Sequence, residues 1–184
     1  DPSHIAVDSL GNVYVANLNS NNVTKFTPQG GASIIGSTGQ FPIGIAVDQS
    51  GNVYTANGLS NNVTKITPEG VSSVLGTTGN FPWAITVDQS GNVYTANVSS
   101  NDVSKITPDG VSSILGTTGD YPWAIALDSE GNIFTANTLS GDVSKITPSG
   151  VSTIFATIGE YSALRGIAID EENNIYVPSL TYGN

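Results

Sequence analysis

The chain has 184 residues, a formal net charge of −10 and no cysteine, and this length is enough for one domain with a buried core. The negative charge repels phosphate backbones and anionic lipid head groups, so nucleic acids and membrane surfaces are disfavoured as partners. The lack of cysteine excludes disulfides, thiolate catalysis and zinc–thiolate sites.

Charged residues make up only 11% of the chain, against roughly 25% in average soluble domains. Glycine, serine, threonine and asparagine are abundant instead, which is typical of short strands joined by tight turns. The chain begins at Asp1, inside a repeat, and has no methionine. We therefore expect a processed or trimmed protein that is exported, either secreted or held at the cell surface.

A repeat of forty residues organises the chain. The sequence Gly-Asn-Val-Tyr begins at Gly11, Gly51 and Gly91, Gly-Asn-Ile-Phe begins at Gly131, and a looser copy begins at Asn173. A fixed period of this length is the mark of a repeat architecture. We interpret residues 1–184 as a single repeat domain, with repeats at approximately 1–40, 41–80, 81–120 and 121–160 and a partial repeat at 161–184.

Each repeat contains four short runs rich in β-branched residues, which we name A to D. In the second repeat these runs are residues 45–47, 53–56, 63–66 and 71–75. Asp48-Gln49-Ser50-Gly51-Asn52 separates A from B, and Thr67-Pro68-Glu69-Gly70 separates C from D. Proline presets one turn position and glycine supplies a positive φ at another, so both segments are predicted hairpin turns. No run reaches the roughly 10–12 residues expected of a helix.

Apolar side chains occur on both faces of the predicted strands. Val53 and Tyr54 are adjacent and therefore point to opposite faces of their strand. A sheet that is apolar on both faces is buried between neighbouring sheets. We predict an all-β protein, a β-propeller of four-stranded antiparallel blades with about 40 residues per blade, in which A is innermost and D outermost.

Three segments of the second repeat resemble a known family. Gly44–Asp48 (GIAVD), Gly51–Tyr54 (GNVY) and Asn61–Gly70 (NNVTKITPEG) are similar to the repeats of NHL-repeat β-propellers and of the related streptogramin-lyase-like group. The resemblance covers essentially the whole chain and implies the propeller fold. Propellers of this kind bind proteins, RNA or small ligands, and some are enzymes, so the resemblance leaves the function open.

The last repeat is incomplete. Four complete blades are followed only by the A run at 166–169 and the B run at 175–177 of a fifth, which gives eighteen predicted strands, and the fifth repeat is offset by two residues. Exposed strand edges favour pairing with other chains. We expect self-association through the chain ends, or contact with segments outside this sequence, rather than an isolated closed monomer.

The resemblance implies that the B–C loops and D–A junctions share one face of the ring, which is conventionally the binding face. The second and third repeats differ at ten positions, and five of these lie in those two segments. The five are Ile43/Trp83, Gly44/Ala84, Gly58/Val98, Leu59/Ser99 and Asn62/Asp102. The candidate ligand-binding residues are Ile43, Trp83, Tyr121, Trp123 and Arg165, with Phe41, Phe81 and Tyr161 nearby. Aromatic faces stack on a sugar ring or hold an apolar side chain, so we expect a protein or glycan ligand; the alternative is that Phe-Pro-Trp plugs the seam between blades.

Repeated polar residues carry two interpretations each. Asp8, Asp48, Asp88, Asp128 and Asp170 end the A runs, and Asn17, Asn57, Asn97 and Asn137 end the B runs. Five carboxylates around one axis suit calcium, but repetition in every repeat favours caps of local turns. We therefore predict no metal site and no cofactor. Lys25, Lys65, Lys105 and Lys145 in the C runs are interpreted as a solvated edge that discourages strand pairing.

Catalysis has little support in the sequence. The resemblance implies a histidine general base for a lyase, and the single histidine is His4, near the beginning of the chain. We predict no catalytic residue and a non-enzymatic propeller that binds or scaffolds through the B–C and D–A loop face. Two alternatives stay open: a structural subunit that forms an oligomer or filament through the fifth blade, and a streptogramin-lyase-like carbon–oxygen lyase with an incomplete site.

Overall fold

The computed structural model describes residues 1–159 and 162–180. Across these residues all regular structure is β, and the strands are joined by short turns. Within the described ranges, no helix is long and apolar enough to cross a membrane.

Four consecutive four-stranded antiparallel sheets form the body of the protein, each in the simple strand order of a meander. The first blade comprises β1 (Pro2–Val7), β2 (Val13–Asn17), β3 (Asn22–Phe26) and β4 (Ala32–Ser37). The second comprises β5 (Pro42–Val47), β6 (Val53–Asn57), β7 (Asn62–Ile66) and β8 (Ser72–Thr77). The third comprises β9 (Pro82–Val87), β10 (Val93–Asn97), β11 (Asp102–Ile106) and β12 (Ser112–Thr117). The fourth comprises β13 (Pro122–Leu127), β14 (Ile133–Asn137), β15 (Asp142–Ile146) and β16 (Ser152–Thr157).

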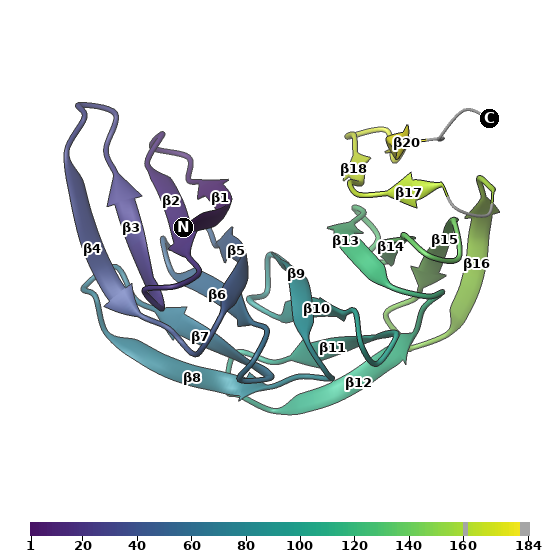
Figure 1. The fold of residues 1–184 in the computed structure, drawn as a ribbon, viewed down its shortest axis with the longest axis horizontal. Coiled ribbons are helices and arrows are strands. Elements are labelled where there is room, and N and C mark those ends of the chain that lie inside the picture. Colours follow the sequence, from purple (N-terminus) through teal and green to yellow (C-terminus); the bar gives the residue numbers. More distant parts are fainter. Residues whose placement is uncertain (160–161, 181–184) are drawn as a thin grey trace.

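The blades follow one another around an arc (Figure 1), which confirms the predicted all-β propeller. The inner strands β5, β9 and β13 face the middle of the arc, and the outer strands β8 and β12 run along its rim. The first blade and the C-terminal strands β18 and β20 stand on either side of the opening. The inner strands begin earlier than predicted, so Trp83 and Trp123 lie inside β9 and β13 rather than just before them.

The core consists of contacts between neighbouring blades. Tyr14 and Val23 of the first blade pack with Ile45 and Ile66 of the second, and the same arrangement recurs at the next two junctions. The B strands β6, β10 and β14 are buried at every position, as expected for sheets that are covered on both faces. Complete burial of one valine or isoleucine stabilises the fold by about 1.5–3 kcal/mol, so each junction contributes substantially.

The fifth repeat forms shorter strands than predicted. Within the predicted A and B runs, β18 (Ala168–Ile169) pairs with β19 (Ile175–Tyr176). A second, unpredicted pair lies outside these runs, where β17 (Ala163–Leu164) pairs with β20 (Ser179–Leu180). The described residues therefore form twenty strands rather than the predicted eighteen. Pro178 lies between β19 and β20, and proline has no N–H group to donate to the ladder. The repeat still packs on the fourth blade, because Leu164 is buried against Phe134.

The interpretation of the repeated lysines as a solvated edge is wrong. Their strands β3, β7, β11 and β15 lie between the B and D strands of each blade and are not at an edge. Each ammonium group instead lies over the aromatic ring of its own B strand, at 5.4 Å from the ring centroid for Lys25 on Tyr14 and 5.8 Å for Lys65 on Tyr54. Cation–π contacts of this kind contribute about 0.5–1 kcal/mol at exposed sites.

Candidate ligand-binding face

Backbone hydrogen bonds bring the B–C loops and the D–A junctions together. The N–H of Gly58 donates to the carbonyl of Phe41 at 2.8 Å, and the equivalent bonds join Val98 to Phe81 and Thr138 to Tyr121. The meander order of each blade places these two connections at the same end of the strands. One face of the propeller is therefore built from both segments, as the family resemblance implied.

The aromatic residues at the D–A junctions are held in an uncommon backbone conformation. Phe41, Phe81 and Tyr121 have positive φ angles of 62°, 56° and 63°. A bulky residue in this region is disfavoured, and such local strain costs on the order of 1–3 kcal/mol. A hydrogen bond to an asparagine of the preceding blade stabilises each of these three backbone conformations. For Phe81, the side-chain oxygen of Asn61 accepts a hydrogen bond from the Phe81 N–H at 2.8 Å. The surrounding blades therefore fix where these rings lie.

Five rings form a continuous series of contacts, which we name the aromatic arc: Phe41, Phe81, Trp83, Trp123 and Tyr121. The centroids of neighbouring rings are 6.0 Å apart for Phe41–Phe81, 6.2 Å for Phe81–Trp83, 4.0 Å for Trp83–Trp123 and 5.7 Å for Trp123–Tyr121. Aromatic pairs at such separations contribute about 0.5–1.5 kcal/mol beyond their area burial. The two indoles are half-buried, so the arc is partly accessible from the loop face.

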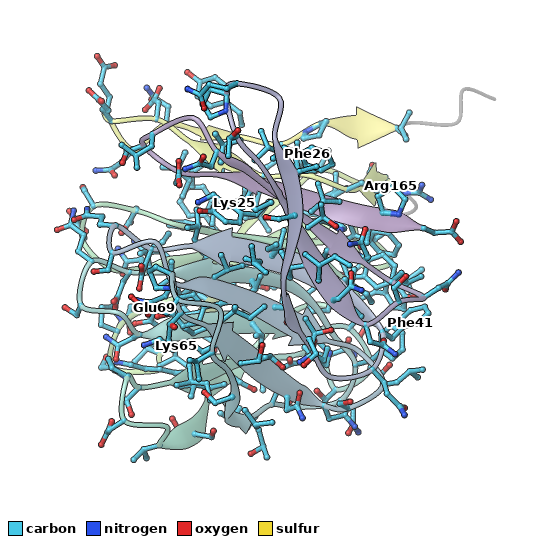
Figure 2. All side chains as sticks on the ribbon, turned by 90° about the vertical axis from the view of Figure 1, so that its left-hand side faces the viewer. Lys25, Phe26, Phe41, Lys65, Glu69 and Arg165 are labelled. Carbon is cyan, nitrogen blue, oxygen red and sulfur yellow. The ribbon has the colours of Figure 1, made fainter. Side chains whose placement is uncertain are left out.

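Three of the five sequence-predicted candidates, Trp83, Tyr121 and Trp123, belong to this arc, and Arg165 lies against one end of it. The guanidinium carbon of Arg165 is 5.5 Å from the ring centroid of Trp123, and the Arg165 side chain is exposed. Figure 2 shows Arg165 and Phe41 on one side of the molecule, whereas Lys65 and Glu69 lie on the other. Ile43, the fifth predicted candidate, is only 2% exposed and therefore offers almost no surface to a ligand in this structure. Tyr161, which the sequence placed near the arc, lies outside the described residues.

Sequence reasoning did not anticipate the state of the Trp83 indole. Its Nε1 atom is buried and makes no hydrogen bond to any described residue. A buried donor without a partner is costly, about 1–3 kcal/mol. Only the three-dimensional placement of the ring reveals this feature, because Trp123 occupies the same position in the next repeat and is the same residue type.

The repeated aspartates cap their own hairpins, which confirms the structural interpretation. One Asp48 carboxylate oxygen accepts hydrogen bonds from the N–H groups of Ser50 and Asn52, and the other accepts from the Asn52 amide and the Tyr54 hydroxyl. The same pattern recurs at Asp8, Asp88 and Asp170. Burial and the hydrogen bond to Asp8 raise the pKa of Tyr14 to about 12.

The repeated asparagines are also structural. Asn97 is completely buried, its amide donates to Asp102 at 2.6 Å and Ser104 at 2.8 Å, and its oxygen accepts from Thr95 at 2.9 Å. Within the described part of the chain, no group of three or more histidine, cysteine or acidic side chains is arranged to hold a metal ion.

The single histidine is exposed. The Nδ1 atom of His4 lies 3.0 Å from the Ser3 hydroxyl, and that hydroxyl donates to the carbonyl of Ile43 at 2.8 Å. The histidine thus belongs to β1, the inner strand of the first blade.

Blades of four-stranded meanders around an arc, with loops gathered on one face, define a β-propeller. The model of the virginiamycin B lyase family matches residues 1–183, so the chain belongs to that family. Curated proteins gave no match to this sequence.

Solved structures share the fold at low sequence identity. Virginiamycin B lyase from Staphylococcus aureus is 20% identical with a TM-score of 0.85, over 96% of this chain and 62% of the lyase chain. Hydrazine synthase from Kuenenia stuttgartiensis is 20% identical with a TM-score of 0.84, over 97% of this chain and 55% of that chain. Nidogen in a complex with laminin is 17% identical with a TM-score of 0.79, over 97% of this chain and 72% of that chain. The chain therefore spans about three fifths of the length of the lyase.

Proposed function

We propose that this chain is a non-enzymatic propeller module that binds a protein or glycan partner through the aromatic arc. The observation that supports this function most is the continuous series from Phe41 to Trp123, flanked by Arg165, which is the only arginine of the chain. Tryptophan, tyrosine and arginine are the residue types that most often dominate binding energy.

The nature of the partner follows from the chemistry of the arc. Half-buried rings offer flat apolar faces that stack on a sugar ring or receive an apolar side chain. Arg165 adds a cation with hydrogen-bond donors at one end. Nidogen, whose propeller is similar in fold, was solved in a complex with laminin, which supports a protein partner as one of the two classes.

The test is a screen of printed glycans and peptides with fluorescently labelled protein. We expect partners whose binding weakens by roughly 2 kcal/mol, about 30-fold, on Trp123→Ala or Arg165→Ala. Glu69→Ser is the matched control, because Glu69 lies on the other side of the molecule (Figure 2) and the fourth repeat carries Ser149 at that position. If no partner depends on Trp123 or Arg165, while Trp123→Ala only lowers stability, the rings are a plug and the proposal is wrong.

A lyase is the second candidate, favoured by the family match. A catalytically inactive histidine-to-alanine variant of the Staphylococcus aureus lyase was solved with quinupristin, so a histidine matters in that enzyme. In this chain the only histidine is the exposed His4. Conversion of quinupristin, followed by chromatography and lost in His4→Ala, would replace the binding function with a lyase function.

Assembly through the chain ends is the third candidate, favoured by the exposed face of the first blade. Ile5 is 66% and Phe26 41% exposed there, whereas their counterparts Ile45 and Ile66 in the second blade are 7% and 0% exposed. Covering such apolar surface is worth roughly 25 cal/mol per Å². Light scattering at micromolar concentration should give a mass above that of one chain, reduced by Ile5→Asn. A monomer at every concentration would remove this candidate.

A further inference from the structure

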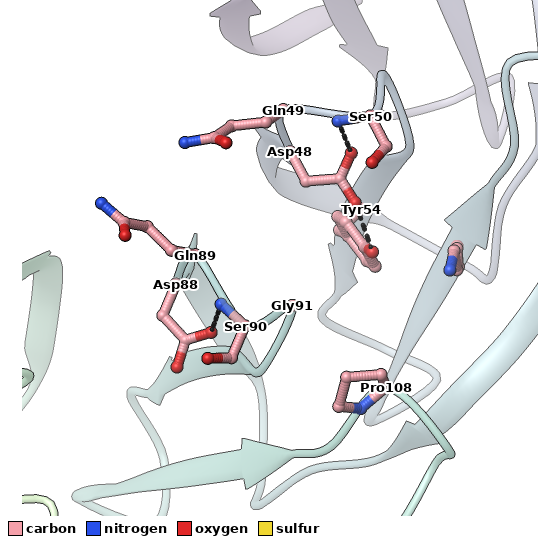
Figure 3. Close-up of a pocket in the computed structure, with 10 residues that line it drawn as sticks. Asp48, Gln49, Ser50, Tyr54, Asp88, Gln89, Ser90, Gly91 and Pro108 are labelled. Carbon is pink, nitrogen blue, oxygen red and sulfur yellow. Dashed lines mark hydrogen bonds between the residues drawn. The ribbon is translucent and has the colours of Figure 1, made fainter.

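A polar pocket lies between the second and third blades, among the A–B turns. Its volume is about 260 Å³, and Figure 3 shows the residues that line it. They are Asp48, Gln49, Ser50, Tyr54, Lys65, Asp88, Gln89, Ser90, Gly91 and Pro108. Lys65 lies on the side of the molecule away from Arg165 and Phe41 (Figure 2), so this pocket is distinct from the aromatic arc.

The same pocket recurs at the junction of the first and second blades in a smaller form. That pocket has a volume of about 160 Å³ and is lined by Leu10, Tyr14 and Lys25, among others. Leu10 occupies the position that Ser50 has in the next repeat, and Ser9 the position of Gln49. The pocket between the second and third blades is therefore larger and more polar than the pocket between the first and second blades.

The carboxylates of the larger pocket do not suit a metal ion. Each Asp48 oxygen already accepts two hydrogen bonds from its own hairpin, and Asp88 has the same four partners. A carboxylate has about four acceptor positions, so a cation would have to displace the bonds that hold the turn.

An anion is disfavoured as well. The pocket contains one ammonium group, that of Lys65, against the carboxylates of Asp48 and Asp88. Lys65 is moreover placed over the Tyr54 ring, 5.8 Å from its centroid. The whole chain carries a formal charge of −10, which adds a long-range repulsion of anions.

The other side chains that line the pocket suit a ligand with neutral hydroxyl groups. Gln49 and Gln89 extend in the same direction from adjacent turns (Figure 3), and each carboxamide offers two donors and an acceptor. Ser50 and Ser90 also line the pocket and carry hydroxyl groups. The volume of 260 Å³ equals about nine water molecules at roughly 30 Å³ each, and it lies below the roughly 300 Å³ at which pockets for drug-sized ligands begin.

We propose that this pocket binds a single neutral sugar residue, whose hydroxyl groups pair with Gln49, Gln89 and Lys65. One ring held by a few polar contacts binds weakly, with a dissociation constant of about 1–10 mM.

The test is a titration of ¹⁵N-labelled protein with the methyl glycosides of glucose, galactose, mannose and N-acetylglucosamine. We expect at least one of them to shift the side-chain amide signals of Gln49 and Gln89 saturably at up to about 100 mM. Gln29 and Gln40, the other glutamines of the chain, lie outside the pocket and serve as internal controls. Calcium chloride and sodium phosphate are titrated in parallel.

Two variants keep the proposal falsifiable. Gln49→Ala combined with Gln89→Ala should weaken binding at least tenfold. Ser50→Leu copies the natural Leu10 of the first repeat, so it should weaken binding similarly without changing the midpoint of unfolding. The proposal is overturned if no glycoside moves the two signals, or if only calcium or phosphate does. Arg165→Ala should leave this titration unchanged, which separates the outcome from that of the aromatic arc.

Discussion

Replacing Asn97 with alanine tests the account of how each blade is held together. The substitution removes three hydrogen bonds, those to Asp102, Ser104 and Thr95. Thr95 is 0% and Ser104 1% exposed, so water cannot readily replace the lost partner. A typical hydrogen bond contributes about 1 kcal/mol, and a buried polar group left unpaired costs about 1–3 kcal/mol. The free energy of unfolding should therefore fall by about 3–5 kcal/mol.

Asn17 in the first blade provides a matched control. It is only half-buried and makes two hydrogen bonds, to Asn22 and Thr24, both at 2.8 Å. Val15 stands where Thr95 stands in the third blade, so Asn17→Ala leaves no threonine hydroxyl unpaired. We expect a loss of about 1–2 kcal/mol there.

Urea unfolding followed by tryptophan fluorescence measures both variants, and the slope against urea should stay constant. Equal losses for the two variants, within about 0.5 kcal/mol, would show that the buried asparagine network does not stabilise the blade as we argue.

Three further predictions concern the junctions and the fifth repeat. Gly79→Ala should destabilise the protein by about 1–3 kcal/mol, because the added Cβ would collide with three polar side chains of the next blade; Gly31→Ala, whose Cβ would meet only a threonine side chain, should cost less in the same unfolding assay. Asn61→Ala should cost about 1 kcal/mol more than Asn61→Gly in differential scanning calorimetry, because Asn61 has a φ of 50°; equal costs would argue against strain there. Hydrogen bonds lower the pKa of Asp170 below its ordinary value of 3.8, the Asn174 side chain being the main cause and the Asn174 backbone another. The ionised Asp170 carboxylate therefore stabilises the fold fully above that ordinary value, and this stabilisation is lost as the pH falls through the lowered pKa of the folded state. Asn174→Ala should move the Asp170 carboxyl titration, followed by NMR, to higher pH, and an unchanged titration would contradict this.

The fold followed from the sequence because the repeat is strict and each turn is chemically explicit. The Asp-x-x-Gly-Asn turns specify hairpins, and apolar residues on both strand faces require sheets on both sides. The turn caps formed by residues such as Asp48 were predictable for the same reason, because the donors and the acceptor of each cap lie within a few residues of one another in the sequence.

The details that sequence could not supply depend on packing between distant residues. The strand position of Trp83 and its unpaired indole result from how two blades meet, which no local pattern encodes. The prediction that Lys65 lies on a sheet edge was wrong because the sequence pattern of a strand does not reveal whether that strand is at the edge or in the interior of its sheet. The division of the fifth repeat depends on Pro178, whose effect on the ladder is visible only with its pairing partner in view.

The most direct test of the proposed binding face uses the two indole N–H signals of the protein, since Trp83 and Trp123 are its only tryptophans. A glycan or peptide selected in the screen is titrated into ¹⁵N-labelled protein, and the indole signals are followed by NMR. Our account predicts that both signals shift saturably, because the Trp83 and Trp123 rings are in contact within the aromatic arc. Binding that leaves both indole signals unchanged, while amide signals elsewhere move, would contradict it.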